Sequence, residues 1–108
     1  MSTDRELLKL AAKAAGFTIV DIVESVAIVK ADHPIAFKWT PLTDDGDALR
    51  LAVKLNFDVC RGLRGPDIGT AVLVMHGTLT VAEYLGDDPY AATRRAIVRA
   101  AAEIWRAA

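Results

Sequence analysis

Three aspartates within four positions, in the segment Asp44-Asp45-Gly46-Asp47, form the first candidate site. Neighbouring carboxylates can bind a divalent cation or exchange protons with a substrate. The spacing does not match a calcium loop, which needs oxygen ligands at alternating positions and a glutamate at the twelfth. Carboxylates also favour a helix start, where Thr43 or Asp44 would cap backbone N–H groups. We therefore predict a helix start here, with magnesium binding or carboxylate-dependent hydrolysis as the alternatives.

A second unusual residue lies roughly fifty positions later, in the segment that we expect to form the last helix. At helical spacing Arg94 falls on the apolar side of this segment, close to Tyr90, Ala101 and Trp105. A buried guanidinium is costly unless it meets a carboxylate or another strong acceptor. The sequence therefore predicts that Arg94 pairs with one of the three aspartates. This pair either holds the fold together or marks a place where Arg94 binds an anionic ligand.

Two further arginines, Arg61 and Arg64, lie in the glycine-bearing segment RGLRGPDIG at residues 61–69. A flexible basic loop can close over phosphate groups, so both arginines are candidate ligand-binding residues. The alternative is an ordinary solvated loop. No phosphate-binding loop signature is present, because the lysine and the serine or threonine that end this motif are missing.

The chain offers few nucleophiles. Its only cysteine, Cys60, lies near a predicted strand end, where we expect a small buried apolar side chain. Its two serines, Ser2 and Ser25, lie outside the strand–turn–helix context of a nucleophile elbow. We therefore expect a binding protein without catalytic residues, metal or cofactor.

Length and composition indicate a single domain over residues 1–108, with 53% hydrophobic residues and a formal net charge of −1. So much apolar content in a small chain favours self-association, so we expect a homo-oligomer. The charge balance gives no reason to expect a nucleic-acid partner. We see no signal peptide and no apolar run that could span a membrane, so we expect a cytoplasmic protein without membrane contact.

Periodicity predicts an α+β domain with the element order α-βββ-α-βββ-α. Thr3 and Glu6 have capping-box spacing before the first helix, Gly16 can end it, and Asp88 and Pro89 suit the start of the last one. We predict helices over 4–15, 47–56 and 89–108, and strands over 17–24, 25–31, 35–39 and 57–60, with a hairpin over 70–85 turning at His76-Gly77.

The middle helix is apolar around most of its circumference. Only Asp47, Arg50 and Lys54 form a polar stripe, and this stripe is narrow. We therefore expect this helix to lie against a sheet and also under another helix or a partner chain.

Two segments, WTPLTDDGDALRLAVKL at 39–55 and DPYAATRRAIVRAAAEI at 88–104, resemble two sequence blocks of the phage ABA-sandwich domain family of small phage and prophage proteins. They cover about a third of the chain. The family usually has Trp-Asn-Pro where this chain has Trp39-Thr40-Pro41, and the ending after Ile104 departs from the glycine expected there. Six positions match recurring residues of the family: Trp39, Asp44, Asp45, Asp47, Arg94 and Arg95. This match adds Trp39 to the candidate ligand-binding residues.

This resemblance implies a layered helix–sheet–helix domain of bacteriophage or prophage origin, and it implies no established activity. Together with the missing catalytic motifs, it predicts an accessory protein that sequesters a small anionic, nucleotide-like host molecule in counter-defence. The alternatives are an inhibitor that blocks a host defence protein by surface contact and a carboxylate-dependent hydrolase.

Overall fold

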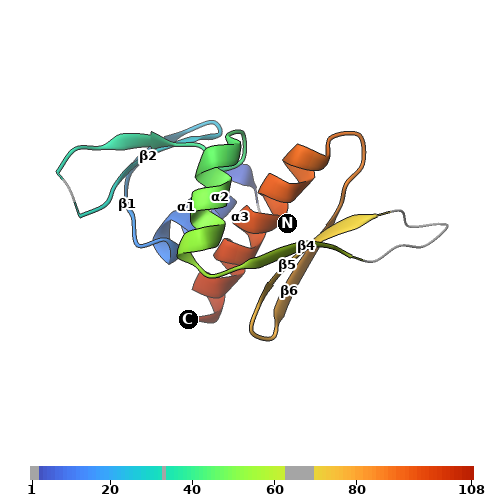
Figure 1. Cartoon of the computed structure of the whole chain (residues 1–108). Helices are drawn as coiled ribbons and strands as arrows, with labels where there is room; N and C mark the ends of the chain where they lie inside the picture. Colours follow the sequence, from blue (N-terminus) through green and yellow to red (C-terminus); the bar gives the residue numbers. More distant parts are fainter. Residues whose placement is uncertain (1–2, 33, 63–69) are drawn as a thin grey trace.

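The computed structural model describes residues 3–32, 34–62 and 70–108. Within them the chain forms three helices and two three-stranded antiparallel sheets, so the predicted α+β class and the order α-βββ-α-βββ-α are confirmed (Figure 1). The elements are α1 (Asp4–Ala14), β1 (Thr18–Val23), β2 (Val26–Lys30), β3 (Phe37–Trp39), α2 (Asp45–Lys54), β4 (Asp58–Gly62), β5 (Ala71–His76), β6 (Leu79–Tyr84) and α3 (Pro89–Ala107).

The first and last helices begin and end where the cap residues predict. The Thr3 side chain accepts a hydrogen bond from the backbone N–H of Glu6 at 3.1 Å. Gly16 follows α1 with a φ of +83°, a left-handed conformation that glycine adopts without strain. The Asp88 carboxylate accepts from two backbone N–H groups at the start of α3, and Pro89 is its first residue.

Each sheet is a simple antiparallel meander. In the first sheet β2 lies between β1 and β3, and Val23 pairs with Val26 across a tight turn at Glu24-Ser25. In the second sheet β5 lies between β4 and β6. Its hairpin turns one residue later than predicted, because His76 still pairs with Leu79.

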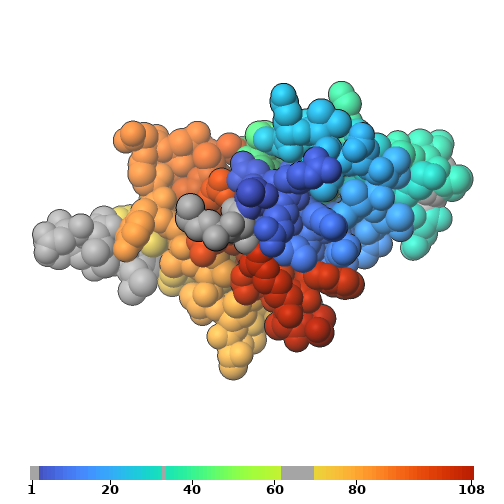
Figure 2. All heavy atoms as spheres, turned by 180° about the vertical axis from the view of Figure 1, so that it is seen from behind, coloured from blue at the N-terminus to red at the C-terminus, as the bar shows by residue number. Residues whose placement is uncertain are grey.

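The helices lie between the two sheets (Figure 1). The first sheet packs on α1, α1 packs on α3, and α3 packs on β5 and β6, while α2 lies on α3. Figure 2 shows α1 against the C-terminal part of α3, where Arg106 and Glu6 form an ion pair at 3.4 Å. The largest fully buried side chains of the described residues come from all these layers: Leu8, Val29, Pro41, Val74 and Val98.

Helix α2 is less covered than its composition predicts. Ala48, Leu51 and Ala52 are buried. Leu49 and Val53 are 63% and 69% exposed, because α2 packs on α3 along one side and no described element covers its outer side. A partner chain over this side stays a prediction.

The prediction of a buried Cys60 is wrong. The Cys60 thiol is free and exposed. It lies in β4, which is an edge strand of its sheet. Side chains alternate between the faces of a strand, and the neighbouring Val59 points toward α2 and α3. Cys60 therefore points to the face of the sheet that none of the described helices covers.

Candidate functional site

The acidic segment begins α2, as predicted. The Asp44 side chain accepts a hydrogen bond from the backbone N–H of Asp47 at 2.8 Å, which makes Asp44 the N-cap. The helix therefore starts at Asp45, two residues earlier than the predicted 47. Carboxylates at this end also interact favourably with the helix dipole.

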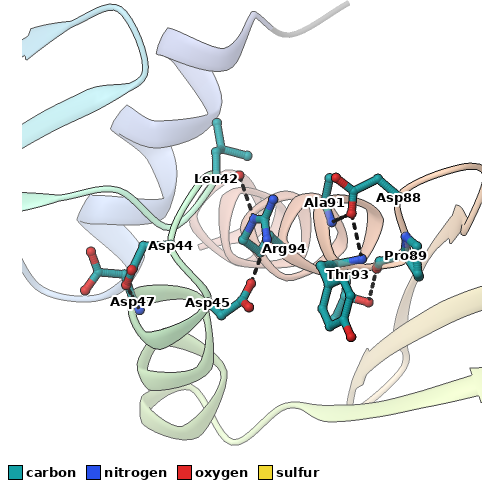
Figure 3. A network of polar contacts seen from close by, with 10 residues as sticks. Leu42, Asp44, Asp45, Asp47, Asp88, Pro89, Ala91, Thr93 and Arg94 are labelled. Carbon is teal, nitrogen blue, oxygen red and sulfur yellow. Dashed lines mark hydrogen bonds and ion pairs between the residues drawn. The ribbon is translucent and has the colours of Figure 1, made fainter.

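Arg94 reaches this segment from α3, which confirms the predicted pairing (Figure 3). Its Nη1 donates to the Asp45 carboxylate at 2.6 Å, and its Nε donates to the backbone carbonyl of Leu42 at 2.9 Å. The Arg94 side chain is 16% exposed, whereas that of Asp45 is 69% exposed. A pair with one solvated partner stabilises by at most about 1 kcal/mol, so the contact mainly positions the start of α2 on α3.

Asp47 points away from Arg94, to the opposite side of α2. Its Oδ2 accepts from the backbone N–H of Thr40 at 2.9 Å, and its Oδ1 accepts from Arg50 Nη2 at 2.7 Å. These bonds connect α2 to the segment that follows β3. All three aspartates are therefore engaged in contacts that begin, anchor or orient α2.

One pocket, the α2–α3 pocket, lies beside Arg94 and has a volume of about 200 Å³. Its walls are mostly apolar, and the Arg94 guanidinium beside them already has two acceptors within the chain. The lining residues are Asp45, Ala48, Leu49, Val59, Tyr90, Thr93, Arg94 and Ile97. This pocket offers a contact for apolar groups and no free cation from Arg94.

A second pocket, the aromatic pocket, lies on the Asp47 side of α2 and has a volume of about 250 Å³. Three aromatic side chains line it. The Phe17 ring meets the rings of Phe37 and Trp39 edge to face, with centroid distances of 5.5 and 5.3 Å. The remaining lining residues are Ala15, Asp47, Arg50, Leu51 and Lys54.

Two cations from α2 line the same pocket. Arg50 is held by Asp47 and lies 3.9 Å from the Asp44 carboxylate. Lys54, one helical turn later, has its Nζ 4.9 Å from the centroid of the Phe17 ring. It forms no ion pair with any carboxylate among the described residues. Lys54 therefore supplies a positive charge that the described part of the chain does not neutralise.

The predicted site residues divide between the two sides of α2. Asp45 and Arg94 meet at the α2–α3 pocket, while Trp39 and Asp47 line the aromatic pocket. Arg61 is exposed at the end of β4 and lines neither pocket. Arg64 lies outside the described residues.

Four residues of the aromatic pocket were missed as site residues: Phe17, Phe37, Arg50 and Lys54. Signals for three of them were present. Phe37 and Trp39 are two positions apart in a strand and therefore share one face. Arg50 and Lys54 are four positions apart in the polar stripe of a helix, so they are neighbours on its surface. Phe17 carried no such signal, because nothing in the sequence shows that it packs against both rings.

Neither a metal cluster nor a membrane span is found in the described part of the chain. No group of three or more histidine, cysteine, aspartate or glutamate side chains there could hold a metal ion. None of the described helices is both long and apolar enough to cross a membrane.

Comparison of the chain with models of known families, with curated proteins and with solved structures finds no match. The resemblance to the phage ABA-sandwich domain therefore stays a prediction. The geometry of the two pockets is what indicates a function.

Proposed function

We propose that this chain is a non-enzymatic accessory protein of a bacteriophage or prophage that acts in the host cytoplasm. It binds a small anionic, nucleotide-like host molecule and withholds it from a host defence system. The resemblance of residues 39–55 and 88–104 to the phage ABA-sandwich blocks supports the origin, and the aromatic pocket supports the binding activity.

The observation that carries the binding activity is the position of Lys54. Its ammonium group lies at a pocket, has no anionic partner among the described residues, and is one turn from a second cation, Arg50. A phosphate or carboxylate that joins Lys54 would form a charge-assisted hydrogen bond, which is stronger than a neutral one. The three aromatic rings beside it provide apolar contact for the rest of the ligand.

Hydrolysis by the aspartates receives no support from their geometry. Asp44 caps α2, Asp45 accepts from Arg94, and Asp47 accepts from Thr40 and Arg50. A carboxylate that acts as a general base needs to reach a substrate proton, and these three are engaged with the chain itself.

The test is to titrate the purified protein with nucleotides and other small phosphates by calorimetry, and to examine protein from cells by native mass spectrometry. We expect Lys54→Gln to weaken phosphate binding about ten-fold, because a hydrogen bond to a charged group contributes about 1.5–3 kcal/mol. Lys38→Gln is the control, since Lys38 is an exposed lysine of β3 that does not line the pocket. A wild-type protein that carries no ligand and binds no small anion would contradict the proposal.

A second candidate function, binding to a host defence protein, is favoured by a different surface. Leu49 on α2 lies beside Val59 on β4 and Tyr90 on α3, and Val53 follows Leu49 one helical turn later on α2. These four side chains are between 41% and 69% exposed. Such an apolar surface, which we call the α2 apolar surface, is typical of a protein contact. The same surface could bind a second copy of this chain, as the predicted homo-oligomer requires.

A further inference from the structure

We infer that the aromatic pocket selects its anionic ligand by a flat heteroaromatic ring, which enters the pocket while the anionic group stays outside beside Lys54. This inference rests on the proposed binding of a nucleotide-like anion and adds which part of that ligand the pocket recognises. It predicts that a nucleotide binds and that the sugar phosphate without its base binds far more weakly.

The arrangement of the rings supports a flat ligand. Phe17 meets Phe37 and Trp39 edge to face at interplanar angles of 88° and 83°. Trp39 is buried in the core, whereas Phe37 is 41% exposed at the pocket. A ligand ring that covers Phe37 would remove this apolar surface from water, and stacking on aromatic side chains is favourable for any nucleobase.

The size of the pocket limits how much of the ligand enters. A cavity of about 150 Å³ is sufficient for benzene, and the aromatic pocket has about 250 Å³. One ring or two fused rings therefore fit, and a sugar with its phosphate does not fit in addition. Because Lys54 is exposed and lines this pocket, its ammonium group is available to the charged part of the ligand that remains in water.

The polar lining suits a heteroaromatic ring better than a hydrocarbon. Arg50 uses Nη2 for Asp47, and its guanidinium has further N–H groups that can donate to ring nitrogen or carbonyl atoms. The Arg50 side chain is 73% exposed, so these donors are accessible. A guanidinium can also stack on an aromatic ring.

Aromatic residues can also bind a quaternary ammonium ion, but the charges at this pocket disfavour a cationic ligand. Lys54 already places a positive charge 4.9 Å from the centroid of the Phe17 ring, and Arg50 lines the same pocket. Asp47 lines the pocket as well and offsets the charge of Arg50, so the charge of Lys54 is the one in excess and would repel a second cation. The charges of the pocket therefore favour an anion over choline-like ligands.

The test compares four kinds of ligand by calorimetry: the four ribonucleoside 5′-monophosphates, ribose 5-phosphate, the four nucleosides and choline. We expect the best nucleotide to bind at least about five-fold more tightly than ribose 5-phosphate, because base stacking adds about 1–3 kcal/mol. Phe37→Ala removes most of this difference, and Phe37→Leu serves if the alanine variant does not fold. Tyr84→Ala is the matched control, since Tyr84 is an exposed aromatic residue that does not line the pocket.

Failure of this inference is distinguishable from failure of the proposed function. If ribose 5-phosphate binds as tightly as the best nucleotide, the ring has no role, although anion binding survives. If the preference for the nucleotide persists in Phe37→Ala, the ring does not bind in this pocket. If a nucleoside binds as tightly as its monophosphate, the proposed binding of the anionic group by Lys54 is overturned, whereas recognition of the ring survives. Choline binding in place of nucleotides overturns both.

Discussion

At the residue scale, Arg94 has two acceptors that contribute differently to stability. The Leu42 carbonyl is partly buried and receives its hydrogen bond from Arg94 Nε at 2.9 Å. The Asp45 carboxylate is mostly exposed and can return to water when its partner is removed. An unsatisfied buried acceptor costs more than a solvated one. The value of Arg94 to the fold should therefore lie mainly in its contact with Leu42.

This difference predicts unequal effects of two substitutions. Arg94→Leu should lower the free energy of unfolding by about 1–3 kcal/mol, because the Leu42 carbonyl loses its donor. Asp45→Asn should lower it by less than about 1 kcal/mol, because the carboxylate is solvated. Urea denaturation of both variants measures the two effects. Equal effects of the two substitutions would contradict the larger contribution of the Leu42 contact. An unchanged stability of Arg94→Leu would overturn the structural role of Arg94.

At the element scale, α2 presents three sides with different properties. Ala48, Leu51 and Ala52 pack into the core. The polar stripe with Arg50 and Lys54 lines the aromatic pocket, and Leu49 with Val53 forms the exposed apolar side. Both pockets therefore depend on where α2 begins and how it is rotated. The N-cap Asp44 determines where it begins.

A pair of substitutions at Asp44 separates the effect of its capping hydrogen bond on stability from the effect of its negative charge. Asp44→Ala should lower the free energy of unfolding by about 1 kcal/mol, because the Asp47 N–H loses its acceptor. Asp44→Ser should retain most of this stability, since serine is also a good N-cap. Thermal denaturation measures both. A serine variant as unstable as the alanine variant would show that the negative charge, and not capping, is what matters.

At the scale of the whole molecule, the two sheets and the helices between them bury part of the large apolar content of the chain. The α2 apolar surface, formed by Leu49, Val53, Val59 and Tyr90, remains accessible in the single chain. The sequence predicted self-association from composition alone. The structure adds a definite surface on which that prediction can be tested.

We expect the wild-type protein to be a homo-oligomer and the double variant Leu49→Gln/Val53→Gln to dissociate at least about ten-fold more readily, because less apolar surface is buried. Sedimentation velocity over a range of concentrations measures this. Val20→Gln/Val23→Gln is the matched control, since this pair is similarly exposed on β1. The wild type could instead be a monomer that binds a host protein, and Leu49→Gln/Val53→Gln alone could lose this partner. In that case the α2 apolar surface serves the second candidate function, binding to a host defence protein.

Much of the fold and part of the site could be predicted from local patterns. The cap residues Thr3 and Asp88 act on backbone groups two or three residues away, so short segments were sufficient to place the starts of α1 and α3. The start of α2 was predicted two residues too late, with its cap left open between Thr43 and Asp44. Arg94 could be matched to the aspartates because a charge on an apolar helix face requires a partner. A buried Cys60 was wrongly expected, because its burial depends on which elements pack over β4. One side of α2 is exposed in the single chain, and a partner chain over it stays a prediction.

By itself, the sequence determined the class, the order of elements, the N-caps of α1 and α3 and the need of Arg94 for a carboxylate or another strong acceptor, since these follow from periodicity, backbone hydrogen bonding and the cost of a buried charge. Only the tertiary structure decided that Asp45 is that carboxylate and that Asp47 faces the other way. It also decided that Phe17 meets Phe37 and Trp39 beside Lys54. The physical reason is that a pocket depends on contacts between residues distant in the chain, and these depend on how α2 and the first sheet pack.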